Sequence, residues 1–296
     1  MGRAPGEPSR RPPSGGAGRS PTTGLDELRR LGSSVVDPDS SAPMALLAFR
    51  PEEAGAALPL SIERTAVEGP LAVSPPRHGA SPGAAPHTLE DELGPYDHAS
   101  VLLCVLDQRR HLPAGMMRLI VPSSSGLKHL SDAERVWGKP RALLFADSGI
   151  DDEPRRTLDL ATIAVARSYR AAALQGMVTM ALCQGLSQIA ARCDMTWVVS
   201  ILHLPVLHTL QWHLQHPFCE FAGLEPRPYL DSPASLPVWM HPESWHARLT
   251  ERDRVLHDIM VQGRGLEPVV QPPDWDGLAE RVREVAALAD LRLHLG

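Results

Sequence analysis

Hydrophobic side chains dominate two adjoining stretches in the middle of the chain. Apolar and β-branched residues fill positions 157–165, which predicts a buried strand. After a polar turn at 167–170 and three alanines, apolar residues recur at helical spacing to about Ala191, which predicts a long helix. A strand that passes through a small-residue turn into a helix offers free amides and a positive dipole end to an anion. We therefore expect an anion-binding turn here, with a pyrophosphate as its ligand.

The same patterns predict the surrounding sheet. Apolar runs at 99–107 and 114–121, separated by a polar break, are typical of an antiparallel hairpin. The β-branched run at 196–202 should lie parallel to the strand at 157–165, because a helix crosses over between them. The expected fold class is α/β, with a mixed, mostly antiparallel sheet, a central parallel strand pair and flanking helices.

Shorter elements are also predicted. Two stretches, 44–49 and 58–67, are apolar with some alternation, and we expect the first strand in the second of them. Ser131 stands three residues before Glu134, as in a capping box, which predicts a short helix through Trp137. The remaining predictions are a short strand at 141–146, a helix from Pro205 to about His213, a closing hairpin at 221–229 and 234–240, a helical region from 242 to about 263, and a last helix capped by Asp274 or Asp276.

Composition divides the chain into three parts. Residues 1–42 are dense in Pro, Gly, Ser and Arg, with too few large apolar groups to offset chain entropy, so a disordered tail is expected. A domain is expected over 43–240, interrupted by a long Pro-rich loop at 69–97. Residues 241–296 should form a helical extension that packs on the sheet or on another subunit, so a homodimer is one expected assembly.

Charge and cysteine content narrow the class of protein. A net charge of -6 argues against a general binder of nucleic acid, since such proteins need a cationic surface. No membrane span and no signal peptide are predicted, and the four separated cysteines suit reduced thiols, so we expect a cytoplasmic protein. Four histidines follow the second parallel strand, but their spacing lacks a supporting pattern, and no metal site is expected; they are His203, His208, His213 and His216.

The residues around the central turn resemble a known signature. Val165, Arg167 and the pair Tyr169-Arg170, followed by small residues and a helix, look like the acyl-CoA signature of the GCN5-related N-acetyltransferase (GNAT) superfamily. The chain has alanine or glutamine where that superfamily usually has glycine. The stretches 101–106 and 115–120 are similar to paired strands of the acyl-homoserine-lactone and N-acyl amino acid synthases, a branch that uses longer acyl chains. The resemblance spans about residues 98–240.

This resemblance implies a function and a set of ligand-binding residues. The expected activity is transfer of an acyl group from acyl-CoA or acyl carrier protein to an amine of a small molecule, with acyl-CoA as co-substrate and no permanently bound cofactor. Arg167 and Arg170 flank the turn, where a guanidinium can pair with phosphate oxygens. The residues expected to bind the donor are Ile163, Val165, Arg167, Arg170, Ala171, Ala173, Gln175 and Gly176.

Three residues are candidates for the chemistry. Asp159 is the one carboxylate in an otherwise apolar strand, near the place where the superfamily keeps its acidic base; a strand-edge aspartate bonded to a loop is the alternative. Strand alternation predicts that Asp159 shares a face with Ile163 and Val165. His203 is a second candidate base, and Tyr229 is a candidate acid for the leaving thiolate.

A second function stays open. The superfamily's usual tyrosine would lie on the helix at 205–213, which has none, and the glycines of the turn are missing. A ligand-binding or scaffolding protein that keeps the fold without turnover is therefore the alternative hypothesis.

Overall fold

The computed structural model describes residues 41–53, 92–151, 154–170, 172–230 and 232–291. The predicted strand at 58–67, nearly all of the predicted tail and most of the predicted loop at 69–97 lie outside these residues. Within them, the first strand is the earlier of the two apolar stretches, β1 (Met44–Phe49).

The described strands form one sheet. Its order is β6-β8-β5-β4-β3-β2-β1-β9, and β7 pairs with β8. The strands are β2 (Ser100–Asp107), β3 (Leu112–Ile120), β4 (Thr157–Val165), β5 (Trp197–His203), β6 (Cys219–Glu220), β7 (Arg227–Tyr229), β8 (Ser232–Met240) and β9 (Val270–Gln271).

Strand direction follows from the connections. The β2–β3 hairpin, β4 beside β3 and β8 beside β5 are all antiparallel, whereas β4 and β5 run parallel because helix α6 (Ala172–Arg192) crosses over between them. β9 also runs parallel to β1. The predicted mixed, mostly antiparallel sheet with a central parallel pair and flanking helices is confirmed.

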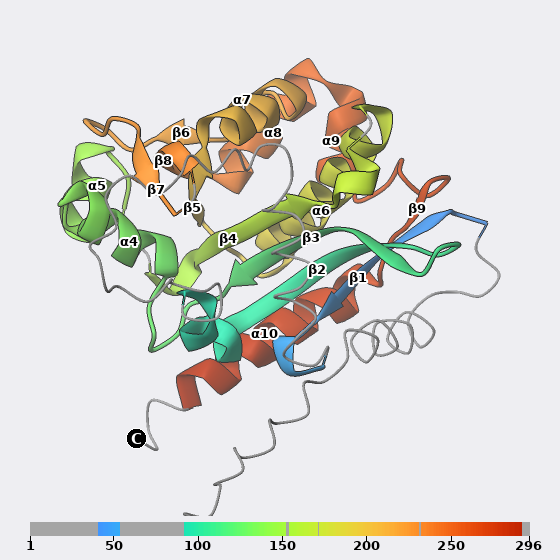
Figure 1. Cartoon of the computed structure of the whole chain (residues 1–296), viewed down its shortest axis with the longest axis horizontal. Coiled ribbons are helices and arrows are strands. Elements are labelled where there is room, and N and C mark those ends of the chain that lie inside the picture. Colours follow the sequence, from blue (N-terminus) through green and yellow to red (C-terminus); the bar gives the residue numbers. More distant parts are fainter. Residues whose placement is uncertain (1–40, 54–91, 152–153, 171, 231, 292–296) are drawn as a thin grey trace, which may run out of the picture.

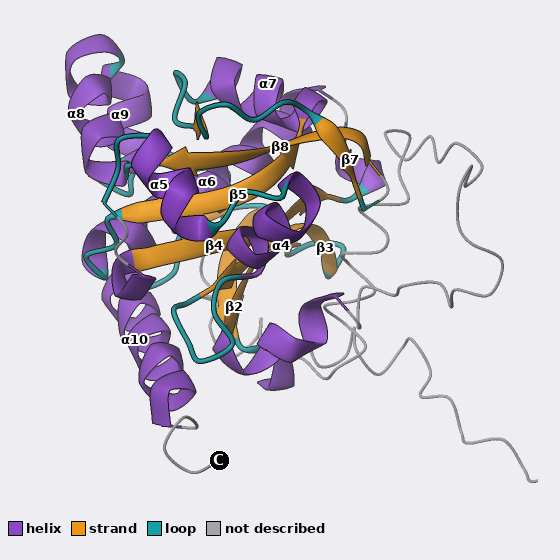
Figure 2. Cartoon of the chain, turned by 90° about the vertical axis from the view of Figure 1, so that its left-hand side faces the viewer, coloured by secondary structure: helices purple, strands orange, loops and turns teal. Residues whose placement is uncertain are grey.

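Helices cover both faces of the sheet (Figures 1 and 2). On one face, α6 lies behind β3 and β4 and shares the main core with α7 (Leu204–His213), α8 (Pro242–Arg252), α9 (Arg254–Met260) and α10 (Trp275–Leu291). On the other face, α4 (Lys128–Trp137) and α5 (Arg141–Asp147) pack on Trp197, Val199 and Ile201 of β5. Four short 3-10 turns complete the described elements: η1 (Pro51–Glu53), η2 (Gly94–Ala99), η3 (Pro154–Arg156) and η4 (Arg167–Tyr169).

Two local predictions are wrong. The stretch at 141–146 is the helix α5, because Leu144 and Phe145 are adjacent in sequence and bury one helical face against the core that α4 and α5 share with β5. Helix α4 begins at Lys128 instead of being capped by Ser131, whose hydroxyl donates to the carbonyl of Leu127. The predicted helical region after Pro242 is confirmed, and it is divided into α8 and α9 at Asp253, which leaves the helical conformation and whose carboxylate accepts from Leu256 N.

A β-bulge in β4 overturns the predicted alternation. The register pairs Arg118 with Thr162 and Leu119 with Leu160, which leaves Ala161 without a partner. Leu160, before the bulge, therefore belongs to the same core as Ile163 and Val165, after it. Asp159 faces α4 instead, so it does not share a face with Ile163 and Val165 as predicted.

Close packing joins α6 to the sheet. A Cβ at Gly115 would lie 2.5 Å from Cγ1 of Val178 and 2.9 Å from the carbonyl oxygen of Ala164, so only glycine fits this point of β3.

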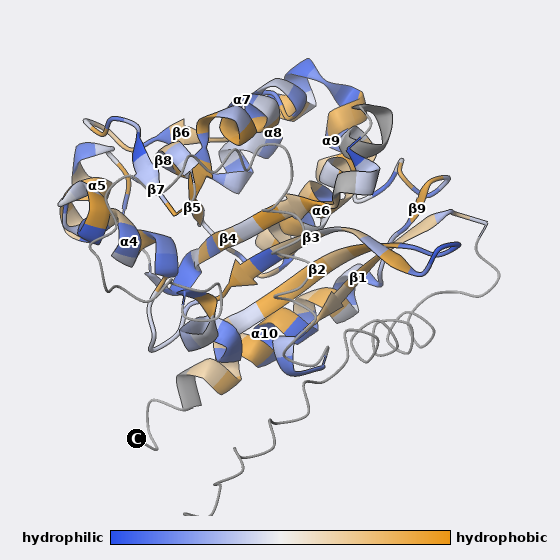
Figure 3. Cartoon of the chain, in the orientation of Figure 1, coloured by the Kyte–Doolittle hydropathy of each residue, from blue (hydrophilic) through white to orange (hydrophobic). Residues whose placement is uncertain are grey.

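The hydropathy colouring of Figure 3 shows apolar residues running along β2 and β3, with polar residues at the hairpin end. Among the described helices, none combines the length and apolar character that a membrane crossing requires.

Candidate functional site

The strands β4 and β5 part at Asp159. They pair only through Thr157–Trp197, Leu158–Val198 and Asp159–Val199, although both continue well beyond these residues. The Ser200 hydroxyl makes one further tie by donating to Leu160 O at 2.8 Å. Beyond this point β5 pairs only with β8 and β4 pairs only with β3, so Asp159 lies where the two parallel strands begin to separate.

Asp159 is wholly buried and faces one residue of α4. Its Oδ2 accepts a hydrogen bond from the backbone N–H of His129 at 2.7 Å, and its Oδ1 lies 2.7 Å from Nδ1 of the same residue. These two atoms lie at the distance of an ion pair, although the ring nitrogen is not aligned for a hydrogen bond. The two side chains form a buried acid–imidazole pair.

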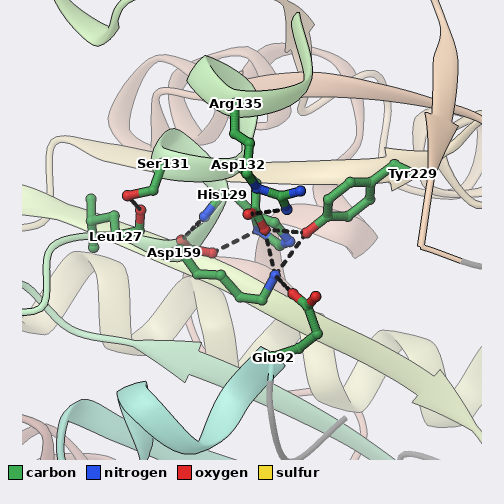
Figure 4. A network of polar contacts seen from close by, with 9 residues as sticks. Glu92, Leu127, His129, Ser131, Asp132, Arg135, Asp159 and Tyr229 are labelled. Atoms are coloured by element: carbon green, nitrogen blue, oxygen red, sulfur yellow. Dashed lines mark hydrogen bonds and ion pairs between the residues drawn. The ribbon is translucent and has the colours of Figure 1, made fainter. Parts of the chain in front are cut away.

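Figure 4 shows Glu92, Asp132, Arg135 and Tyr229 gathered beside His129 and Asp159. Lys128, the neighbour of His129 in sequence, joins several of them. The Lys128 ammonium lies 2.5 Å from Oδ2 of Asp132 and 3.0 Å from Oε2 of Glu92, and it donates to the Tyr229 hydroxyl at 2.8 Å. The Tyr229 hydroxyl donates in turn to Asp132. Together with His129, Asp159 and Arg135, these residues are called the α4 polar cluster below.

The cluster sets the ionisation of two members. Burial by itself raises the pKa of Asp132, but the charge and hydrogen bond of Lys128, with the hydrogen bonds from Tyr229 and Arg135, outweigh it and hold that pKa at about 2. Burial and the Asp132 carboxylate raise the pKa of Tyr229 far above its ordinary value. Asp132 is therefore ionised and Tyr229 keeps its phenolic proton at neutral pH.

The turn after β4 is fixed by side chains on both flanks. Nε of Arg170 donates to the carbonyl of Val165 at 2.9 Å, across the turn. The Tyr169 ring is buried, and its hydroxyl donates to Oδ2 of Asp107 at the end of β2. The Nε–H group of Arg170 therefore stabilises the conformation of the turn.

An apolar pocket adjoins β4 on the α6 face. Its volume is about 10 Å³, which is about the space of one water molecule. Cys183 lies in its wall, and burial raises the pKa of that thiol to about 12, so Cys183 is no nucleophile at neutral pH. The other lining residues come from β4, α6, α7, α8, β8 and the segment after α7, among them Leu160, Leu186, Leu210, Leu214 and Trp245.

The structure brings some predicted residues together and separates others. Asp159 and Tyr229 both belong to the α4 polar cluster. His203 ends β5 and precedes α7, four residues past the partner of Asp159, so it lies about 13 Å further along the strand at ~3.3 Å per residue.

The residues predicted to bind the donor follow one another along β4, η4 and α6. Ile163 and Val165 are half-buried against the main core, and Gly176 lies in α6 with open space where a Cβ would stand. Ala171 lies outside the described residues. Arg167 belongs to η4, and Ala173 and Gln175 belong to α6.

Sequence reasoning missed the partners of Asp159 and Tyr229. His129 attracts no notice in the sequence, whereas Lys128 and Asp132 stand four residues apart, a spacing that indicates an ion pair on a helix. Arg118 was missed as well: it is 1% exposed in β3, and its Nη1 lies 2.6 Å from Oδ1 of Asp97. Among the described residues, no three His, Cys, Asp or Glu side chains converge to hold a metal ion.

The order of elements decides the fold. An antiparallel run ends in β4, a helix crosses over, and a parallel β5 pairs briefly with β4 and then parts from it. This order is the one expected of a GNAT-like fold. No family model matches the sequence, and no curated protein matches it.

Several solved structures of acyl-transferring enzymes are similar to this chain at low identity. A CoA-dependent acyl-homoserine lactone synthase, BjaI, with SAM and isopentyl-CoA, is 14% identical with a TM-score of 0.47, over 81% of this chain and 99% of BjaI. The acyl-homoserine lactone synthase LasI is 12% identical with a TM-score of 0.47, over 75% of this chain and 96% of LasI. FeeM, an N-acyl amino acid synthase from uncultured soil microbes, is 12% identical with a TM-score of 0.45, over 69% of this chain and 94% of FeeM. At these identities the likeness concerns the fold alone.

Proposed function

We propose that this protein is an acyltransferase that moves an acyl group from acyl-CoA or acyl carrier protein to the amine of a small molecule. The observation that carries the proposal is the pair formed by Asp159 of β4 and His129 of α4, at the point where β4 and β5 part. Acyl transfer from a thioester to an amine needs a group that removes a proton from the amine and a proton for the leaving thiolate. An acid–imidazole pair can serve both needs.

The donor is assigned to the turn between β4 and α6. Backbone amides at the start of a long helix attract phosphate oxygens, and Arg170 adds a positive charge beside them. Ile163, Val165, Arg167, Ala171, Ala173, Gln175 and Gly176 stay predicted donor contacts, and Asp159, His203 and Tyr229 stay predicted participants in the chemistry.

The apolar pocket is too small for an acyl group in this conformation. Its free space of about 10 Å³ is that of about one water molecule, and even the shortest acyl group is larger. We propose that an acyl group enters here only when α7 or α8 moves away from Leu160, because Leu210 of α7 and Trp245 of α8 close the pocket.

Turnover with a panel of acyl-CoA donors and small amines tests the proposal. We expect free CoA and an N-acyl product, and we expect Asp159→Asn to lower turnover by ~10²–10⁴-fold, the usual worth of general-base assistance, with acyl-CoA binding retained. The exposed Asp151→Asn is the matched control. A folded Asp159→Asn protein with normal turnover would place the base elsewhere, and His203 would be tested next.

One observation favours the second candidate, a ligand-binding or scaffolding protein without turnover. Asp159 has no exposed surface, and both of its oxygens are engaged by His129. A carboxylate held in this way also serves to anchor α4 on the sheet. Tight acyl-CoA binding with no product from any donor–amine pair is the outcome expected of such a protein.

A further inference from the structure

Both members of the Asp159–His129 pair are buried, and the imidazole is the less buried of the two. The Asp159 side chain is 0% exposed, whereas the His129 side chain keeps 4%. One carboxylate oxygen accepts the His129 backbone N–H and the other lies against its ring Nδ1. Of the two groups, the ring is therefore the one with surface to offer to an amine.

The carboxylate also selects the tautomer of the ring. A proton on Nδ1 is stabilised by Oδ1 of Asp159 at 2.7 Å, which leaves the lone pair on the opposite nitrogen, Nε2. A neutral imidazole in this tautomer is a base whose free end points away from the strand that holds its partner.

Charged and phenolic groups surround the ring. They are three carboxylates, two cations and two phenols, so with the phenols neutral the groups around His129 carry one net negative charge. The Tyr229 ring packs edge-on against the imidazole, with the ring centres 6.1 Å apart. These groups are Lys128, Asp132 and Arg135 of α4, Asp159 of β4, Tyr229 of β7, Tyr96 of η2, and Glu92.

We propose that His129, oriented by Asp159, accepts the proton of the acceptor amine, a role that rests on the acyl transfer proposed above. The amine lone pair attacks the thioester carbonyl carbon and a C–N bond forms. Nε2 takes one proton from that nitrogen, the C–S bond breaks, and the imidazolium returns the proton to the departing sulfur. The products are an amide and free CoA thiol, with no net change in protons. Asp159 acts here as a positioning residue.

The test uses the full-length chain with a donor–amine pair that the wild type turns over. His129→Gln keeps the backbone N–H that Asp159 accepts and removes the base, so kcat should fall by ~10²–10⁴-fold while the Kd for acyl-CoA stays within about twofold. His208→Gln, an exposed histidine of α7, is the control and should change neither quantity. In the wild type, kcat/KM should fall on the acid side as the imidazole is protonated, and this acid limb should be missing from the residual activity of His129→Gln.

A second measurement uses the wild type alone. ¹⁵N chemical shifts of labelled histidine should show His129 protonated at Nδ1 and free at Nε2 near pH 8, and Asp159→Asn should shift this balance. If the wild type turns over and His129→Gln is equally active, the role of His129 is overturned and the acyltransferase proposal stands. If the wild type shows no turnover at all, both proposals are overturned.

If His129→Gln fails to fold, the wild type alone decides. A ring that is protonated at both nitrogens between pH 6 and 9, or at Nε2 alone, overturns the role of His129. A ring protonated at Nδ1 alone, together with an acid limb in kcat/KM, supports it.

Discussion

The hydroxyl of Tyr169 donates a hydrogen bond to Oδ2 of Asp107 over 2.7 Å, and this contact ties the turn after β4 to the β2–β3 hairpin. Oδ1 of the same carboxylate accepts from the backbone N–H groups of Arg109 and Arg110. One carboxylate thus holds the hairpin turn and the start of the proposed donor site together. The geometry of that site therefore depends on a residue 62 positions away in sequence.

Removing this hydroxyl should loosen the turn. Tyr169→Phe keeps the buried ring and deletes one hydrogen bond to a charged group, so we expect the free energy of unfolding to fall by about 1.5–3 kcal/mol. Urea unfolding followed by circular dichroism measures the change. The exposed neighbour Ser168→Ala is the control and should stay within about 0.5 kcal/mol of wild type. Equal stability of Tyr169→Phe and wild type would show that the contact contributes nothing.

The ionised Asp132 carboxylate should make the stability of the protein depend on pH. Its pKa is lowered from 3.8 to about 2 in the folded protein, so its contribution is present above about pH 4 and is lost as the pH falls toward 2. At 1.36 kcal/mol per pKa unit the contribution is about 2 kcal/mol.

Unfolding of wild type and Asp132→Asn in urea, from pH 7 down to pH 2, tests this dependence. Asp132→Asn should be less stable by about 2 kcal/mol at pH 7, and the difference should shrink between pH 4 and pH 2. A constant difference across that range contradicts the prediction, and Asp151→Asn serves as an exposed carboxylate control.

Replacing two glycines near α6 with alanine should change the stability of the protein in opposite directions. Gly115→Ala brings a methyl group within 3 Å of Val178 and the Ala164 carbonyl, and we expect a loss of about 1–3 kcal/mol. Gly176→Ala meets nothing within 4 Å inside a helix, and we expect a gain of about 0.5–1 kcal/mol. Thermal unfolding of both variants measures the contrast. A loss of acyl-CoA affinity in the stabilised Gly176→Ala protein would support Gly176 as a donor contact.

Arg170 should matter for the donor. If the turn binds the pyrophosphate, Arg170→Ala weakens CoA binding by about 1.5–3 kcal/mol, measured by calorimetry. Arg155→Ala removes the same charge from the exposed turn η3 and should leave the Kd unchanged. Because Arg170 also donates to Val165 O, urea unfolding of the variant is measured alongside. An unchanged Kd for Arg170→Ala would rule out this arrangement.

The sequence by itself determined the elements that depend on short-range pattern. The apolar run of β4, the 3.6-residue period of α6 and the polar break before β3 are properties of neighbouring residues, and the expected sheet with its parallel pair follows from their order. Asp159 could be singled out for the same reason, since a lone carboxylate in an apolar strand is visible in the sequence.

Only the tertiary structure decided how these elements meet. The bulge at Ala161 depends on the register with β3, which no local pattern encodes, and it moves Asp159 to the face opposite Ile163 and Val165. The stretch at 141–146 becomes a helix because its two buried side chains pack on a core that joins α4 to distant residues such as Trp197 and Phe221. His129 meets Asp159 across thirty positions of sequence, and that pairing follows from where α4 docks on the sheet. Burial and ion pairing arise between elements, and for this reason the carboxylate of Asp159 could be singled out from the sequence whereas its imidazole partner could not.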